Sequence, residues 1–209
     1  MIRARLAAPW VAVLGLAVLG AAAAGETPGD ATRGRAVFAG KGCGRCHLRR
    51  DEGQGMGPPL EAIRRPQGML ELAGRLWNHA PAMFATVEQE GLKWPDMTRE
   101  QMADLMAYLQ ADPTRDPTPV PLQGQVVLVR KGCLKCHRLR GEGGTEAIEL
   151  TAYHGRYASP VVWATTIWNH APRMAGAARR LGILYPRFSG DEMANLVEFL
   201  RSTTAATTK

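Results

Sequence analysis

A five-residue motif, C-x-x-C-H, occurs twice in this chain, at residues 43–47 and at residues 133–137. The motif is typical of covalent haem attachment, in which two thiols bond the vinyl groups of one haem and the neighbouring imidazole binds its iron. On a helical turn, positions i, i+3 and i+4 lie on one face, so the three side chains can reach a single haem. The chain has four cysteines, and because all of them lie in the two motifs, none remains for a disulfide.

The motifs therefore predict two covalently bound haem c groups, each carrying iron. The residues expected to hold them are four cysteines and two proximal histidines: Cys43, Cys46, His47, Cys133, Cys136 and His137. Two other chemistries also use C-x-x-C. A zinc site would need both motifs to converge and would leave the histidines unexplained. A thioredoxin-like redox pair would need a surrounding βαβ pattern, and neither motif has one.

Both motifs belong to a longer internal repeat. Residues 34–47 align with residues 124–137 at an offset of 90. One residue is then gained, and the offset becomes 91 for two further pairs of segments, 76–83 with 167–174 and 91–110 with 182–201. The repeat indicates that one domain has been duplicated.

Between the two repeats, four prolines in nine residues predict a stiff, extended linker. The Ser-, Thr- and Ala-rich end of the chain is expected to fray. The predicted organisation is a signal peptide or uncleaved anchor at residues 1–24, a first domain at 25–112, a linker at 113–121, a second domain at 122–202 and a flexible tail at 203–209.

The N-terminus has the pattern of a secretory signal. Arg3 and Arg5 form a short positive region, and an apolar stretch follows at residues 6–19. Three alanines at residues 22–24 suit a cleavage site. The alternative is an uncleaved anchor, because residues 6–24 approach the roughly 20 residues that a membrane span needs. Export agrees with the haem motifs, since c-type haem is attached outside the cytoplasm.

Each repeat is expected to open and to close with a helix. Asp30 or Thr32 can cap the first opening helix. The closing helices begin with capping boxes, Thr98 with Gln101 and Ser189 with Glu192. Behind each box, apolar residues recur at i, i+3, i+4 and i+7, which predicts a buried stripe. We interpret the methionines in these stripes as packing residues.

With these features, each half resembles a class I cytochrome c domain: an N-terminal helix, C-x-x-C-H, a Gly/Pro loop, a middle helix and a C-terminal helix. The resemblance covers residues 30–110 and 122–202. It implies an all-α fold of two tandem class I cytochrome c domains, each wrapped round one covalent haem. The whole chain is similar to the di-haem class I cytochromes c of bacterial periplasms, which implies a periplasmic location.

The second axial ligand of each iron departs from the family pattern. In class I cytochromes it is usually a Met followed by Pro, shortly before the C-terminal helix, but here those places hold Trp94-Pro95 and Tyr185-Pro186. A substitute should recur in both repeats, which leaves a methionine pair, Met83 and Met174, and a histidine pair, His79 and His170. We expect the methionines to bind iron, because Met ligation is the rule in the superfamily and Met suits an apolar pocket. The histidines are the alternative ligands.

The histidine pair lies in a repeated Trp-Asn-His-Ala-Pro box. We expect its tryptophans, Trp77 and Trp168, to wall the haem or to meet a propionate through the indole N–H. On the proximal side, residues 57–60 resemble the family loop whose carbonyl accepts the N–H of the proximal imidazole. The second repeat has no proline there, at residues 144–149. The two haems are therefore expected to differ in potential.

The formal net charge of +7 is unevenly distributed. Residues 25–112 carry 11 Lys and Arg against 12 Asp and Glu, whereas residues 120–209 carry 12 against 6. A basic second domain could dock an acidic redox protein or steer the encounter with it. Haem propionates could instead use part of the excess. No motif for reading nucleic acid is present, and membrane contact is expected only through the N-terminus or a membrane-bound partner.

The predicted function is single-electron transfer between redox partners, without enzymatic turnover. The alternatives are a cytochrome subunit of a membrane or dehydrogenase complex, and a di-haem peroxidase. A peroxidase needs one open iron with an acid/base residue above it, whereas both repeats carry a matched candidate for the distal ligand.

Overall fold

The structure is a computed structural model that describes residues 28–152 and 154–205. The described chain is mostly helical, with one short antiparallel hairpin of β1 (Arg138–Leu139) and β2 (Glu142–Gly143). This confirms the all-α class. The candidate signal peptide lies outside the described residues. Within the described part of the chain, no helix has the length and apolar character to cross a membrane.

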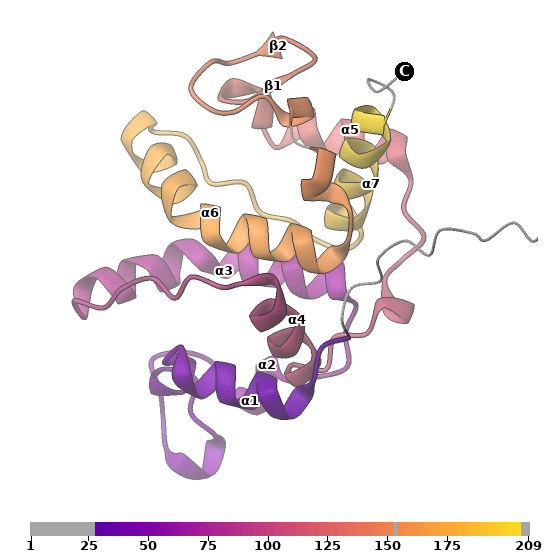
Figure 1. The fold of residues 1–209 in the computed structure, drawn as a ribbon. Coiled ribbons are helices and arrows are strands. Elements are labelled where there is room, and N and C mark those ends of the chain that lie inside the picture. The colour runs from indigo at the N-terminus through magenta and orange to yellow at the C-terminus, as the bar shows by residue number, and fades with distance from the viewer. Residues whose placement is uncertain (1–27, 153, 206–209) are drawn as a thin grey trace, which may run out of the picture.

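Seven α-helices make up the described fold (Figure 1): α1 (Ala31–Gly40), α2 (Leu60–Ile63), α3 (Met69–Gln89), α4 (Arg99–Tyr108), α5 (Pro121–Arg130), α6 (Pro160–Leu181) and α7 (Glu192–Ala205). Helices α1 to α4 form the first half, and α5 to α7 form the second. In each half the first helix packs against the last, α1 on α4 and α5 on α7.

The two helix crossings are made possible by glycine. A Cβ on Gly34 would overlap the carbonyl oxygen of Asp104, and a Cβ on Gly124 would overlap that of Asn195. The backbones therefore approach more closely than any side chain allows. Near the first crossing, the ring of Phe38 lies 5.6 Å from that of Tyr108.

The predicted starts of α1 and α4 are confirmed, whereas the box predicted at Ser189 forms only in part. Asp30 caps α1 by accepting the N–H of Arg33 at 2.7 Å. The capping box of α4 is complete, because Gln101 N–H donates to Thr98 Oγ1 at 3.2 Å and Thr98 N–H donates to Gln101 Oε1 at 3.1 Å. These contacts satisfy N–H groups that have no partner inside the helix. Ser189 N–H donates to the Glu192 carboxylate at 2.9 Å, but Glu192 N–H donates to the Ser189 carbonyl and not to its hydroxyl, and α7 begins at Glu192 itself.

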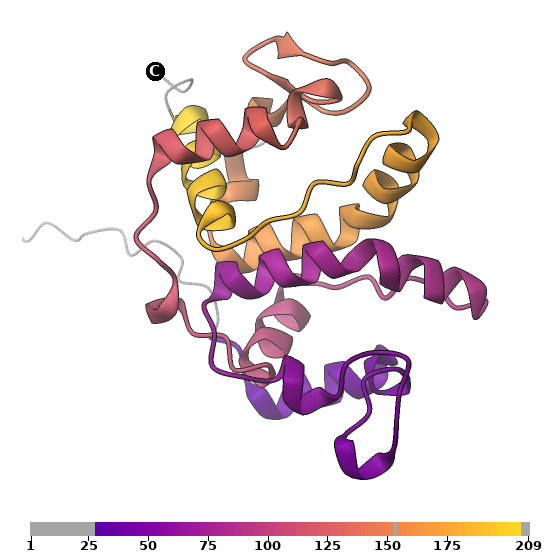
Figure 2. The ribbon, with the colours of Figure 1, turned by 180° about the vertical axis from the view of Figure 1, so that it is seen from behind.

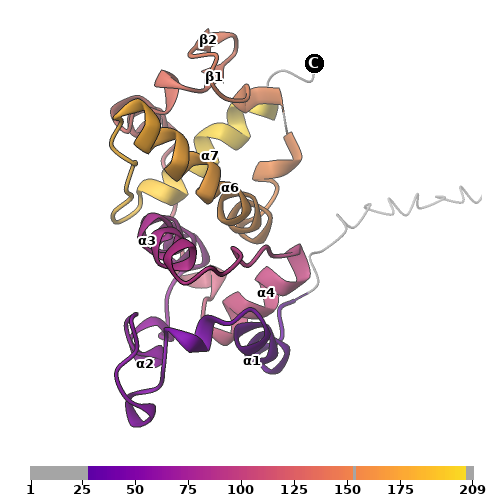
Figure 3. The ribbon, with the colours of Figure 1, turned by 90° about the vertical axis from the view of Figure 1, so that its left-hand side faces the viewer.

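The long helices α3 and α6 pack against each other between the two halves. Figure 3 shows them side by side, with α1 and α4 beyond α3 and α7 beyond α6. Each helix continues past a proline of the repeated box, Pro81 or Pro172. Proline has no N–H, so the carbonyls of Trp77 and Trp168, four residues earlier, lose their helical donors.

One buried cluster extends across both halves. It contains Met102 and Met106 of α4, which are fully buried, together with Ile167 of α6 and Met193 of α7. The predicted methionine packing is thus confirmed. The halves share a core, because the apolar faces of α3 and α6 cover each other.

The segment that joins the halves runs along one side of the molecule (Figure 2). Part of it is folded: residues Pro113–Arg115 form a 3₁₀ turn. Asp116 then accepts the N–H of Leu70 at 2.7 Å, which ties the segment to the start of α3.

The C-terminal helix is longer than we expected from the sequence. We predicted a flexible tail from residue 203, but α7 continues to Ala205. Thr203 and Thr204 are buried, and the hydroxyl of Thr203 donates to the carbonyl of Phe199 at 2.7 Å. Burial of these side chains therefore holds the last turn in place. Residues 206–209 lie outside the described part.

Candidate functional site

Each C-x-x-C-H motif folds as a tight turn at the end of the opening helix. Gly42 and Gly132 precede the motifs with φ of 76° and 71°, a left-handed conformation that glycine adopts at little cost. A 3₁₀ turn follows at Cys43–Arg45 and Cys133–Lys135. In the first half, Cys43, Cys46 and His47 line one cavity, as covalent attachment of a haem would require.

The proximal histidines are oriented by a carbonyl in both halves. Nδ1 of His47 donates to the carbonyl of Pro58 at 2.9 Å, and Nδ1 of His137 donates to the carbonyl of Ile148 at 3.0 Å. A carbonyl can only accept, so the proton is on Nδ1 and the lone pair is on Nε2, which is then available to bind iron. In the second half, the carbonyl that orients the imidazole belongs to Ile148 and not to a proline.

The loop around Ile148 is held by other means. The carboxylate of Glu149 accepts the N–H of Arg140 at 3.0 Å and that of Gly141 at 2.9 Å, and the hydroxyl of Thr151 at 2.6 Å. Burial penalises this charge, but the hydrogen bonds outweigh burial and lower the pKa of Glu149 to about 2. In the first half, Pro58 and Pro59 restrict the corresponding loop; in the second half, hydrogen bonds to the Glu149 carboxylate hold the loop instead.

On the opposite side of each site lies the histidine of the repeated box. The ring centroid of His79 is 5.6 Å from that of His47, and that of His170 is 6.4 Å from that of His137. Two imidazoles bound to one metal ion at the usual nitrogen–metal distance have centroids about 6 Å apart. Both separations therefore fit an iron atom between the rings.

The same two histidines each have one buried nitrogen without a partner. Nε2 of His79 and Nε2 of His170 make no hydrogen bond and are closed off from solvent. Burial lowers the pKa of His79, as does the neighbouring His47. Burial also lowers the pKa of His170 to about 4, with contributions from His137 and two arginines. Each ring is therefore neutral and has a lone pair to offer.

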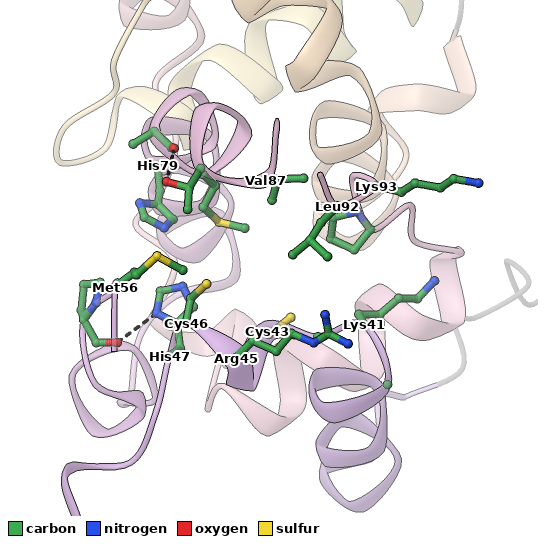
Figure 4. Close-up of a pocket in the computed structure, with 18 residues that line it drawn as sticks. Lys41, Cys43, Arg45, Cys46, His47, Met56, His79, Val87, Leu92 and Lys93 are labelled. Atoms are coloured by element: carbon green, nitrogen blue, oxygen red, sulfur yellow. Dashed lines mark hydrogen bonds between the residues drawn. The ribbon is translucent and has the colours of Figure 1, made fainter. Parts of the chain in front are cut away.

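Two adjoining cavities of about 330 and 360 Å³ surround the first motif. Figure 4 shows His79 and His47 on opposite sides of the first cavity. The lining residues common to both cavities are Cys43, His47, Pro58, His79 and Met83. The cysteines, the proximal histidine and both candidate distal ligands thus face one space, which fits a haem.

The methionine pair has a different environment from the histidines. Met83 lies one turn after His79 on α3 and lines both cavities, and it also packs against the shared core. Met174 packs against the same core from α6. A thioether in an apolar cluster needs no further partner, whereas a buried imidazole nitrogen does.

The tryptophans of the box do not have the role we expected for their N–H groups. The indole of Trp77 donates to the carbonyl of Pro186 at 2.6 Å, and that of Trp168 donates to the carbonyl of Pro95 at 2.8 Å. Each donor therefore binds the other half and is not available to a propionate. The ring of Trp168 does line a cavity, but it is the cavity of the first half.

The asparagine of the box also reaches across. Asn78 donates to the carbonyl of Phe188 at 2.6 Å and accepts its N–H at 2.8 Å. Asn169 makes the matching pair with Met97, at 2.8 and 2.9 Å. We did not predict these contacts, although the repetition of the asparagine in both boxes was a signal for them.

The loops in place of the usual Met-Pro ligand face the other half too. The ring of Trp94 lies 4.5 Å from that of Trp168, and its indole donates to the Trp168 carbonyl at 3.3 Å. Tyr185 stacks on Trp77 at 4.8 Å. These aromatic contacts tie both loops to the other half of the molecule.

The alternative uses of C-x-x-C find no support. Burial raises the pKa of Cys43 and of Cys133 to about 11, whereas dithiol chemistry needs a thiolate near neutral pH. Among residues 28–152 and 154–205, no three His, Cys, Asp or Glu side chains gather to hold a zinc ion.

Residues 31–111 match the family model for Cytochrome c. Searches of curated proteins and of solved structures found no match. The family match supports a class I cytochrome c domain in the first half, with covalently bound haem c and a role in electron transfer.

Proposed function

We propose that this protein is an exported di-haem c-type cytochrome that passes single electrons between redox proteins. The observation that carries the proposal is the same arrangement in both halves: a C-x-x-C-H turn, a carbonyl-bound proximal imidazole, and a buried second imidazole facing it. Because the two halves agree in all these elements, a second haem in residues 120–205 is the simplest explanation for their chemistry.

Haem, when bound, supplies a one-electron cycle between Fe(III) and Fe(II). Cys43 and Cys46 would hold the first group, and Cys133 and Cys136 the second. The carbonyls that bind the proximal histidines fix each ring and raise its basicity. Apolar residues of the shared core keep water from the sites, which lowers the reorganisation needed when the charge changes.

We propose His79 and His170 as the distal ligands, in place of the methionines that the family pattern favoured. The support is that their Nε2 atoms are buried and unpartnered and lie across the site from the proximal rings. An unpaired buried nitrogen destabilises the fold, and ligation removes that cost. Bis-histidine ligation would give lower potentials than histidine–methionine ligation.

Electron transfer suits such sites better than turnover does. An iron with a histidine on each side has no open position for peroxide, so the peroxidase alternative is disfavoured. The basic second half could bind an acidic redox partner, either as a free carrier or as a subunit of a larger complex. Copurification of the exported protein with a partner would favour the subunit.

The experiment that tests the function is spectroscopy of the purified holoprotein. We expect two haems per chain in a pyridine haemochrome assay, low-spin iron at both sites, and no near-infrared band from an iron–methionine bond. His79→Ala and His170→Ala should each convert one haem to high spin.

Met83→Leu and Met174→Leu are the matched controls, because leucine keeps the apolar volume. They should leave the low-spin signals unchanged. An iron–methionine band in the wild type that disappears in these variants would show that methionine is the ligand. A single haem per chain would exclude the di-haem function.

A further inference from the structure

Three consecutive residues in each box connect two different parts of the molecule. In the first half, Trp77 and Asn78 bind the backbone of the second half, and the next residue, His79, faces the proximal ring of its own site. Successive residues on a helix point about 100° apart, so α3 can present one face to each. In the box of α6, Trp168 and Asn169 bind the backbone of the first half, and His170 faces the ring of His137 in its own half.

The contacts across the interface are well placed to fix the distal helix. Trp77 and Trp168 are only 6% and 5% exposed. Each asparagine both donates to and accepts from one residue of the opposite loop, which fixes its direction as well as its distance. Breaking one of these part-buried bonds would leave a polar group at the interface without its partner.

The proline of the box makes this support necessary. Pro81 cannot donate to the carbonyl of Trp77, so the helix lacks one of its own bonds close to His79. The equivalent carbonyl of Trp168 accepts the Trp94 indole of the first half instead. In α6, therefore, the other half of the molecule supplies a bond where the helix lacks one of its own.

We propose that Asn78 and Asn169 are positioning residues that couple the two iron sites: each fixes the distal histidine of its own half by binding the loop of the other half. The proposal rests on the proposed function, because it assumes that His79 and His170 bind iron. It has a specific consequence. A change in the loop of the second half at Phe188 should loosen the iron site of the first half, on the other side of the interface.

The test measures how fast carbon monoxide binds to each ferrous haem of the full-length holoprotein. Carbon monoxide can bind only after the distal histidine has left the iron, so the rate reports how firmly that ligand is held. His79→Ala and His170→Ala identify which signal belongs to which site. Gln89→Ala, at the exposed end of α3, is the control for an amide-to-alanine change on the same helix.

Asn78→Ala should speed binding about tenfold at the first iron, since it leaves part-buried groups unpaired. Phe188→Ala, a change in the second half, should act at the same first iron, because Phe188 packs on Trp77 and its backbone binds Asn78. Asn169→Ala should act at the second iron. Haem content and helicity should equal those of the wild type, and Gln89→Ala should change neither rate.

The proposal is overturned if Asn78→Ala changes neither rate, or if Phe188→Ala acts only at the second iron. Asn78→Ser and Phe188→Leu are milder variants, with the same expected order of sites, in case the alanine variants do not accumulate with both haems. Failure of the proposed distal ligands has a different signature: His79→Ala would then change the rate at neither iron.

Discussion

The closing helices of the two halves carry different side chains at one equivalent position, Asp104 on α4 and Asn195 on α7. Both accept a backbone N–H at the start of the opening helix, from Asp30 and from Val120, each at 2.7 Å. In the first half, Arg33 adds two bonds of 2.8 Å to the same carboxylate. The acceptor geometry is thus common to both halves, and only the charge differs.

This difference shows which part of the crossing is essential. The glycine that allows the close approach and the oxygen that accepts the N–H occur in both halves. The ion pair occurs in only one of them, and the second half folds with a neutral amide instead. The close approach of the two backbones is therefore common to both crossings, and the ion pair makes the stability of the first crossing depend on pH.

The largest effect is expected from adding a methyl group at the crossing. Gly34→Ala and Gly124→Ala should each lower the free energy of unfolding by about 3 kcal/mol or more, because the new Cβ would overlap a backbone carbonyl that cannot move alone. Urea denaturation followed by circular dichroism measures this. Gly40→Ala is the control, since a Cβ there meets nothing within 4 Å. A tolerated Gly124→Ala would show that the two crossings are not equivalent.

A smaller effect should follow from giving the first half the side chain of the second. Asp104→Asn keeps the acceptor but loses the ion pair, and we expect a loss of about 1 kcal/mol at neutral pH, since the Arg33 side chain is 59% exposed and screened by water. The hydrogen bond from Arg33 outweighs burial and lowers the pKa of Asp104 in the folded protein.

The sign of the pH effect follows from that lowered pKa. The ion pair contributes fully above the unfolded pKa of about 3.9, and its contribution disappears as the pH falls below that value through the folded pKa. Denaturation of the wild type and of Asp104→Asn should therefore differ at pH 7 and converge in acid. A difference that persists unchanged in acid would contradict this assignment.

An effect of similar size but opposite sign concerns Trp94 and Tyr185, which occupy equivalent loops. Trp94 has a partner for its N–H, whereas the hydroxyl of Tyr185 is buried without one, and burial raises its pKa. Tyr185→Phe removes the unpaired hydroxyl and should stabilise the protein by about 1 kcal/mol. Thermal unfolding of the holoprotein measures this. Destabilisation by Tyr185→Phe would mean that the hydroxyl is bonded in the holoprotein.

Much of the local structure could be predicted from the sequence. The caps of α1 and α4, the buried methionine stripes and the turn at each C-x-x-C-H depend on residues a few positions apart, so their spacing is sufficient. The proximal contact in the second half could not be predicted, because any residue has a carbonyl. Ile148 was identified only when the loop held by Glu149 placed it beside His137.

By itself, the sequence determined the haem attachment residues, the helical class and the repeat, because each depends on local spacing or on comparison of the chain with itself. The tertiary structure decided the role of the Trp-Asn-His-Ala-Pro boxes. Trp77 and Asn78 meet residues more than 100 positions away, and no local pattern records such a contact. The proposed distal histidines belong to the same category, since only the packing of α3 and α6 shows that their nitrogens are buried, unpaired and opposite the rings of His47 and His137.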